Sequence, residues 1–393
     1  MDPNKLRDIV LNAELPHVVL NVTVPWDCFK LTFEEWCEKY DCARKELVAF
    51  EGCPVKAGRR PQWERARTEM KMSMSDICKP QPDIAGRWNS FSYRNISELP
   101  AVCRSGINFA CFGFPSVDED ISFWISSPNA HTPGHYDTYG CNIVVQVFGK
   151  KSWILFPPEA KLTPVRVPFE ESSVYCEENF YSPSSYGDLT DVENQAYHVV
   201  LEPGMALIVP PRWWHYVETL EPSLNFNTWL PLQNDIEGLL SECITKILIQ
   251  DICQDLPLPV KKHIFNPNED SMSGDEGLKE SFAILDYLTH QKKYNKLLRP
   301  DRKRYSAGYL SSEAMSTLLE DSKPFVRPVP RLENCSFFQM MKHNHLRYDA
   351  SIDLRFEESL RKHEAEQLTV ACRQINCCCN PAVVQLIKEA LLR

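Results

Sequence analysis

The feature that most constrains the fold is a series of short β-branched and aromatic runs between residues 106 and 232, broken by proline and glycine. Residues of these types favour strands, and Gly149-Lys150 and Pro203-Gly204 supply turns between them. Short strands at this spacing predict an antiparallel barrel or sandwich. The runs predicted as strands are 121–126, 141–148, 152–156, 198–201, 205–209 and 214–219.

The composition is that of a folded globular chain. Of its 393 residues, 43% are hydrophobic and 24% are charged, which excludes wholesale disorder, a collagen-like fibre and a coiled coil. At about 150 residues a domain, the length predicts two to three domains or one large domain with extensions. The formal net charge of −10 argues against a nucleic-acid-binding or membrane-binding surface over the whole protein.

The sixteen cysteines are interpreted as reduced thiols. The chain is long, and its start shows no basic segment followed by an uninterrupted apolar run, so no secretory signal is visible. No segment approaches the roughly 18 apolar residues that a membrane span needs. We therefore expect a cytoplasmic protein, with the nucleus as the alternative location and no membrane partner. Cys377-Cys378-Cys379 is not expected to bind metal, because consecutive cysteines cannot all converge on one ion.

Changes of pattern divide the chain into five regions. An apolar stripe predicts a helix at 235–253, which would pack on the barrel or form a homodimer interface with a second copy. A basic cluster at 292–304 is interpreted as a solvated face. The predicted regions are an N-terminal α/β region at 1–105, the barrel core at 106–234, a helical extension at 235–265, a polar and partly flexible linker region at 266–344, and C-terminal helices at 345–393.

Residues 157–197 interrupt the series of strands. This stretch carries several tyrosines and serines and the acidic pair Glu170-Glu171. Connections of this length are usually functional loops or disordered insertions, so we interpret the stretch as a lid. Its acidic pair favours a basic or polar polypeptide over a phosphate backbone.

The segment HTPGHYD holds the first candidate metal ligands, His135 and Asp137. Residues two apart on a strand point to the same face, so an imidazole and a carboxylate can address one ion. A barrel brings distant strands together, and His215 follows the predicted strand at 205–209. Two histidines and one carboxylate with open coordination positions suit Fe(II) and oxygen chemistry, whereas zinc is more often closed by four ligands.

An iron site of this kind takes 2-oxoglutarate as its reductant, and the far carboxylate of that molecule needs a cation and a hydroxyl. Lys151 offers the cation and Thr132 offers the hydroxyl. A lysine that points into a barrel is unfavourable without an anionic partner, so the ligand would stabilise it. A shift of one residue in register would exchange Lys151 and Lys150, so both remain candidates for the cation inside the barrel.

Neighbouring residues have more ordinary interpretations. His131 is expected to face solvent, with a donor role behind the metal ligands as the alternative. His198 is expected to be structural, and Trp213 and Trp214 are expected to pack in the barrel.

Several motifs together resemble one protein family. HTPGHYD, GKKSWILFPPE, and VPPRWWHYV followed by NFNTW look like JmjC-type 2-oxoglutarate oxygenases, in the branch that includes the asparaginyl hydroxylase of hypoxia-inducible factor. Within this branch, the chain resembles a member named for its association with a small heat-shock protein. The resemblance covers residues 106–232 well and implies a double-stranded β-helix, which is a jelly-roll or cupin-like barrel, with flanking and C-terminal helices.

The resemblance also implies roles for individual residues. It makes His135, Asp137 and His215 the iron ligands, and it favours Lys151 over Lys150 because of the spacing to the following Phe-Pro-Pro. The residues that it assigns to 2-oxoglutarate are Thr132, Lys151, Asn142, Asn227 and Trp124.

The function predicted from the sequence is that of an Fe(II)- and 2-oxoglutarate-dependent oxygenase. It would hydroxylate a protein or peptide side chain and release succinate and CO2. One alternative is a catalytically silent binding module that serves as a scaffold for a chaperone partner. The other alternative is an RNA-modifying oxygenase. The net charge argues against it, whereas the basic segments at 59–67 and 292–304 are compatible with it.

Overall fold

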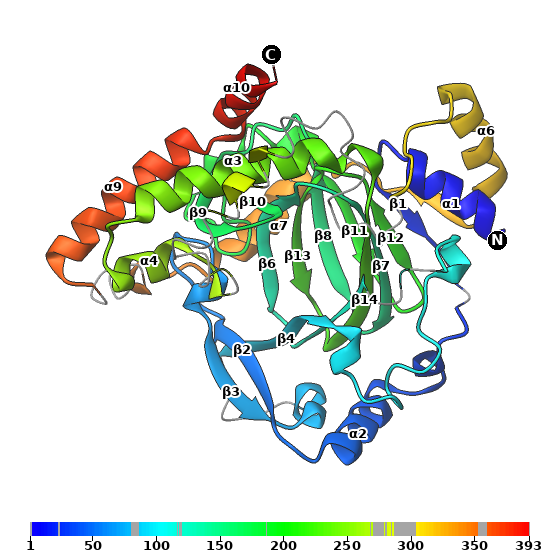
Figure 1. Cartoon of the computed structure of the whole chain (residues 1–393). Coiled ribbons are helices and arrows are strands. Elements are labelled where there is room, and N and C mark those ends of the chain that lie inside the picture. Colours follow the sequence, from blue (N-terminus) through cyan, green and yellow to red (C-terminus); the bar gives the residue numbers. More distant parts are fainter. Residues whose placement is uncertain are drawn as a thin grey trace.

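The computed structural model describes residues 2–22, 24–79, 86–115, 117, 120–185, 187–267, 269, 279, 281–283, 285–286, 304–352 and 360–392. Their strands form two antiparallel sheets that pack face to face (Figure 1). Helices lie outside the sheets. The predicted fold, a jelly-roll or cupin-like barrel with flanking helices, is confirmed.

The larger sheet carries the N-terminal strands. In sheet order its strands are β15 (Val326–Pro328), β1 (His17–Val19), β12 (Ala206–Val209), β7 (Cys141–Phe148), β14 (Ser223–Leu230), β5 (Ile121–Ser126), β4 (Arg87–Asn95), β2 (Val48–Pro54) and β3 (Thr68–Met72). The smaller sheet contains, in order, β11 (Tyr197–Leu201), β8 (Lys151–Phe156), β13 (Trp214–Thr219), β6 (His131–Asp137), β10 (Ser173–Cys176) and β9 (Pro164–Glu170).

The central strands do not alternate between apolar and polar residues as the strands of a half-exposed sheet do, and β7 shows the reason. All of its residues are buried, because it is covered on both faces. Ile143 and Val145 join the apolar cluster on the outer side of the larger sheet. Val144 points between the sheets and packs with Trp153 and Leu155 of β8. The space between the sheets is therefore closed by apolar side chains beside the polar residues described below.

The turn between β7 and β8 decides which lysine enters the barrel. Gly149 has a φ of +62°, and a Cβ there would lie 2.0 Å from the carbonyl oxygen of Pro222. Only glycine fits this turn without strain. Lys150 then lies outside, beside Glu202 and Glu221, while Lys151 begins β8 with its side chain inside.

Two N-terminal helices cover the outer face of the larger sheet. They are α1 (Pro3–Asn12) and α2 (Phe33–Arg44). The Thr32 hydroxyl and the Glu35 carboxylate form a capping box that fixes the start of α2. Phe33, Trp36 and Tyr40 of α2 are buried and pack in the core.

The remaining described helices are α3 (Ile236–Cys253), α4 (Leu258–Ile264), α6 (Ser312–Ser322), α7 (Asn334–His345), α9 (Lys362–Cys378) and α10 (Pro381–Leu391). Of these, α6 packs beside α1, and the others lie on the side of the smaller sheet. Figure 1 shows α9 and α10 beside α3, and α7 contributes Phe337 and Met341 to the outer side of the smaller sheet. The predicted helix at 235–253 thus packs against helices of its own chain, and its role in a homodimer stays a prediction.

A buried ion pair joins α3 to the smaller sheet. The Arg166 guanidinium of β9 lies 2.6 Å from the Glu242 carboxylate of α3, with both side chains almost fully buried. Arg166 also donates to the carbonyl of Ser173 in β10. This pair fixes the helical layer against the edge of the barrel.

The interpretation of residues 157–197 as a lid is wrong where this stretch forms strands of the smaller sheet. This stretch contains β9 and β10, and β10 pairs with β6, which carries His135 and Asp137. Glu170 is buried and accepts hydrogen bonds from Tyr175 and Asn266, while Glu171 pairs with Lys246. Serines and glutamates that form bonds inside the protein have the same sequence pattern as those of a solvated loop, so the sequence does not distinguish the two.

Sheet pairing also crosses the predicted regional boundaries. Strand β4, before residue 106, pairs with β5, after it, in one continuous sheet. In the predicted linker region at 266–344, the structure contains α6, β15 and α7. Of the basic cluster at 292–304, all but Arg304 lies outside the described residues; Arg304 donates to the carbonyl of Leu232.

All sixteen cysteines are free. Within the described part of the chain, no helix combines the length and the apolar character that crossing a membrane requires.

Candidate metal centre

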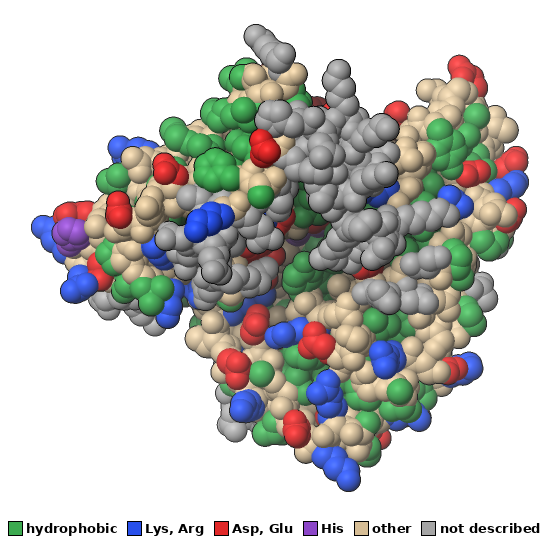
Figure 2. Space-filling view, in the orientation of Figure 1, with side chains coloured by type: hydrophobic (Ala, Val, Ile, Leu, Met, Phe, Trp, Pro, Cys, Tyr) green, Lys and Arg blue, Asp and Glu red, His purple; other side chains and the backbone are tan. Residues whose placement is uncertain are grey.

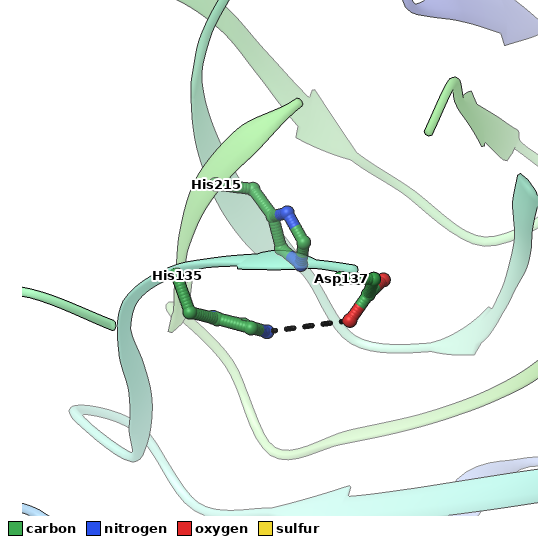
Figure 3. A group of neighbouring side chains, drawn as sticks. All are labelled: His135, Asp137 and His215. Carbon is green, nitrogen blue, oxygen red and sulfur yellow. Dashed lines mark ion pairs between the residues drawn. The ribbon is translucent and has the colours of Figure 1, made fainter. Parts of the chain in front are cut away.

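Three side chains from two neighbouring strands meet inside the barrel. His135 and Asp137 lie on β6, and His215 on β13 is paired directly opposite His135. One ligand atom from each lies within 4.8 Å of the others (Figure 3). His135 Nε2 lies 3.9 Å from Asp137 Oδ1. Among the described residues, this is the one group of three or more His, Cys, Asp or Glu with metal-ligand spacing.

The backbone orients both imidazoles for metal binding. The Nδ1–H of His135 donates to the Pro133 carbonyl at 2.9 Å, and that of His215 donates to the Trp213 carbonyl at 2.9 Å. These bonds leave Nε2 of each ring as a free lone pair directed at the centre of the group. Burial, and then the neighbouring His135, lower the pKa of His215 to about 4. His215 is therefore neutral near pH 7, as a metal ligand must be.

The carboxylate of Asp137 is held by a tryptophan. Trp229 Nε1 of β14 donates to Asp137 Oδ2 at 2.9 Å. Its other oxygen, Oδ1, is the one that faces His135. The donor set is thus two imidazole nitrogens and one carboxylate oxygen on one side of the centre, which fits a facial Fe(II) site.

Lys151 is the cation that the sequence predicts for the interior of the barrel. Its side chain is 6% exposed and its Nζ lies 6.0 Å from the centroid of the Trp124 ring. Burial lowers its pKa to about 7, and no ionisable neighbour contributes to the shift. A buried ammonium in such a position favours an anionic ligand.

The other residues assigned to 2-oxoglutarate face the same interior. Trp124 Nε1 donates to Asn227 Oδ1 at 2.8 Å, and Asn227 Nδ2 donates to Asn142 Oδ1 at 3.0 Å. Thr132 of β6 is paired with Val217 of β13, a strand that is also paired with Lys151. The two sheets therefore contribute a line of polar groups beside the three candidate ligands.

Comparison with known proteins agrees with this geometry. The model of the family described as "Cupin-like domain" matches residues 54–235. The chain is 30% identical to the HSPB1-associated protein 1 homolog of Danio rerio over 83% of this chain and 77% of that protein. The chain belongs to the cupin-like JmjC family.

Two further relatives lie in this family. HSPB1-associated protein 1 of Homo sapiens is 30% identical over 63% of this chain and 54% of the human protein. Lysine-specific demethylase 8 of Xenopus tropicalis is 25% identical over 57% of this chain and 49% of that protein. The chain thus spans about half the length of these two relatives. The cupin-like JmjC family is a family of 2-oxoglutarate oxygenases, and the family match includes β13 and β14 as well as β6.

The residues next to the candidate ligands in the sequence have structural surroundings, and one of them differs from its sequence interpretation. His131 does not face solvent: it is buried and stacks on Tyr181 with ring centroids 3.8 Å apart. It lies with Tyr216 on the outer side of the smaller sheet, away from the candidate ligands. His198 bonds Ser152 at 2.9 Å, and Trp213 and Trp214 are both buried, as expected.

Sequence reasoning missed three aromatic residues at the centre. They are Trp229, which bonds Asp137; Tyr175, whose ring lies 5.8 Å from that of His135; and Tyr93, which contacts Trp229 and Trp124. Trp229 stands at the end of the NFNTW motif, in which only Asn227 has a predicted role. Tyr93 lies on a strand whose sequence is too polar to be recognised, and Tyr175 lies on a strand of four residues within the stretch interpreted as a lid.

Replacing Trp229 with phenylalanine is expected to lower the affinity for Fe(II) by about 10- to 100-fold, because Asp137 loses the donor that orients it. The ring is kept, so packing changes little. Metal affinity measured by calorimetry, with Mn(II) as a redox-stable substitute, checks this result. An affinity equal to that of the wild type would show that Asp137 holds its orientation without Trp229. Trp26→Phe, which removes a similar donor to a backbone carbonyl on the outer side of the larger sheet, is the matched control.

Proposed function

We propose that this chain is an Fe(II)- and 2-oxoglutarate-dependent oxygenase that hydroxylates a protein side chain and releases succinate and CO2. The observation that carries the proposal is the convergence of His135, Asp137 and His215, with their ligand atoms within 4.8 Å of one another, in a barrel that also buries Lys151. Bound Fe(II) would supply the activation of oxygen, coupled to decarboxylation of 2-oxoglutarate.

The residues of the chain have distinct parts in this proposal. His135, Asp137 and His215 hold the metal, and their backbone and Trp229 bonds keep them oriented before it binds. Lys151, with Thr132, holds the distal carboxylate of 2-oxoglutarate. Asn142, Asn227 and Trp124 line its other side. The apolar cluster around Trp153 excludes water from the reaction.

The direct test is release of succinate from 2-oxoglutarate by the full chain loaded with Fe(II), with and without candidate peptides. We expect slow release that a suitable peptide accelerates, together with a gain of one oxygen atom in that peptide by mass spectrometry. Absence of both 2-oxoglutarate binding and turnover would reject the enzyme.

The affinity for 2-oxoglutarate is expected to fall as pH rises above about 7, by up to about tenfold per pH unit. Burial lowers the pKa of Lys151 to about 7 in the free protein, and a bound carboxylate raises it again. Below this pKa the ammonium is already present, so affinity is constant; above it, binding must take up a proton. Calorimetry on the Mn(II)-loaded protein at several pH values checks this.

Two variants of Lys151 sharpen that experiment. Lys151→Met removes the cation, so it should bind weakly at every pH. Lys151→Arg keeps its charge throughout this range, so its profile should be flat. If wild-type affinity is also flat across this pH range, Lys151 does not hold the carboxylate.

A second candidate function is a chaperone-binding module without turnover. The names of the Danio rerio and Homo sapiens relatives favour it, since both are called HSPB1-associated proteins. We propose that this chain also associates with a small heat-shock protein. Stoichiometric binding that survives His135→Ala, with no turnover in the wild type, would support the scaffold as the sole function.

No observation favours an RNA substrate over a protein side chain. In the basic segment at 59–67, Arg65 donates to the Phe265 carbonyl and Arg67 lies 3.7 Å from carboxylate oxygens of Glu51 and Glu64. Figure 2 shows Lys and Arg interspersed with Asp and Glu over β2 and β3 rather than gathered in one basic patch.

A further inference from the structure

Helix α3 crosses the end of the barrel at which β6 ends with Asp137 (Figure 1). The turn from β6 to β7 follows this candidate ligand directly. Within the turn, the N–H of Gly140 donates at 2.9 Å to the carboxylate of Asp235, the N-cap residue of α3. Asp235 also accepts from the N–H of Leu232 at 2.6 Å, and its side chain is buried. The turn after Asp137 is therefore bonded to the start of the helix.

Gly238 lets α3 approach the same turn closely. A Cβ at this position would lie 2.5 Å from the carbonyl oxygen of Thr138 and 3.5 Å from Cδ1 of Tyr139. An atom cannot remain so close to a backbone oxygen, so the helix or the turn would have to move. Glycine makes a helix less stable than alanine does, and this close approach explains its presence here. The helix thus packs on the backbone of the residue next to Asp137.

A buried ion pair extends the contact along the same face of α3. Glu242 follows Gly238 by four residues, which places both on one side of the helix. Its carboxylate lies 2.6 Å from the guanidinium of Arg166, and Arg166 also donates to the Ser173 carbonyl at 3.1 Å. Ser173 of β10 is paired with Asp137 of β6. Through this pair the helix also reaches the strand position beside Asp137.

Lys246 makes a similar contact about one helical turn further along. It pairs with Glu171 in the turn between β9 and β10. The next residue, Ser172, accepts a hydrogen bond at 2.9 Å from the N–H of Thr138 through its carbonyl. These bonds hold the residue after Asp137 from a second direction.

The three candidate ligands are oriented in different ways. His135 and His215 each donate from Nδ1 to a backbone carbonyl two residues earlier in the chain. The carboxylate of Asp137 is instead held from another strand, by Trp229, and Asp137 is the last residue of β6. The position of its backbone therefore depends on the turn that follows, and α3 holds that turn.

We infer that α3 positions a metal ligand: Asp235 and Gly238 hold the turn after Asp137, and through this turn they hold the Asp137 carboxylate in the direction that metal binding needs. This inference rests on the proposed function, because it assigns Asp137 to a metal. Asp235 and Gly238 are positioning residues, since they touch the backbone of the turn and not the metal. Moving α3 away from the turn should lower metal affinity, while the two histidines keep their orientation.

The test compares metal affinity with and without the Asp137 carboxylate. Calorimetry measures binding of Ni(II) to the full chain, because Ni(II) binds imidazole more tightly than Mn(II) or Fe(II) and remains measurable with two histidines. Gly238→Ala and Asp235→Asn should each lower the Ni(II) affinity by about tenfold. In chains that also carry Asp137→Ala, the same substitutions should change it by less than about twofold, because the group that they position is absent.

Two further measurements control for effects on the fold. Ser241→Ala also introduces an alanine into α3, where the Ser241 hydroxyl bonds only the Glu237 carbonyl of its own helix, and it should bind Ni(II) like the wild type. Circular dichroism verifies that each variant is folded. Asp235→Asn keeps the size of the side chain and leaves one oxygen for two N–H donors, so it carries the test if Gly238→Ala does not fold.

The outcomes separate the two proposals. If Gly238→Ala and Asp235→Asn lower Ni(II) affinity equally with and without the Asp137 carboxylate, the positioning role is wrong while the metal site stands. Unchanged affinity in both variants would overturn that role as well. A Ni(II) affinity that His135→Ala leaves unchanged would place the ion elsewhere and would reject the metal centre on which both proposals depend.

Discussion

Replacing His135 with alanine is expected to lower the affinity for Fe(II) by more than about 100-fold and to abolish succinate release. Loss of a residue that only hydrogen-bonds a metal ligand already lowers metal affinity by about 10- to 100-fold, and His135 is itself a candidate ligand. His135 supplies one of three ligand atoms within 4.8 Å of one another, and its Nδ1 is already bound to the Pro133 carbonyl. Without its Nε2, one imidazole and one carboxylate remain, which no longer form a facial site. Calorimetry with Mn(II) and a succinate assay measure the two effects.

The matched control for this substitution is His198→Ala. His198 lies on β11 and bonds Ser152, away from the candidate ligands. Its replacement should leave metal affinity within a factor of about two, since the site does not depend on that bond. If His135→Ala binds Fe(II) as tightly as the wild type, the three residues are not a metal site, and the proposed function falls with them.

Replacing Arg166 with methionine is expected to lower the free energy of unfolding by about 3–5 kcal/mol. The side chains of Arg166 and Glu242 are 2% and 4% exposed, and the guanidinium lies 2.6 Å from the carboxylate. Removing the cation leaves a buried carboxylate without its charge partner. Urea unfolding near neutral pH, followed by tryptophan fluorescence, measures the loss. A loss below about 1 kcal/mol, the range of exposed pairs, would contradict burial of this pair.

The control for Arg166→Met is the double variant Arg166→Met, Glu242→Leu. With both charges replaced by apolar groups, stability should return close to that of the wild type. Burial raises the pKa of Glu242 even with Arg166 present. This shift gives the sign of the pH dependence of stability. Without Arg166 the folded state favours the protonated acid more strongly, so the loss from Arg166→Met should shrink as pH falls toward the pKa of Glu242.

Much of the barrel could be predicted from local sequence. The predicted strands at 121–126, 141–148 and 214–219 coincide with β5, β7 and β13. These strands are rich in β-branched and aromatic residues, and turn residues such as Gly149 mark their ends. The pattern is local, so it is visible without knowledge of the partners.

Two of the strands that escaped prediction have polar residues inside the protein. β14 reads SLNFNTWL, and its inward Asn227 bonds Asn142 and Trp124. β9 contains Arg166 and Glu170, which are neutralised or bonded within the protein. A polar residue in a strand reads as solvent-exposed unless its partner is known, and the partners here lie far along the chain.

By itself the sequence determined that this chain forms a barrel of short strands, and that His135 and Asp137 share one face, because both depend on the two-residue period of a strand. Tertiary structure decided the rest. Pairing of β13 with β6 places His215 opposite His135, and the Gly149 turn puts Lys151 inside instead of Lys150. Trp229 reaches Asp137 from the other sheet. Such contacts depend on register and on the packing of two sheets, which join residues that no local pattern connects.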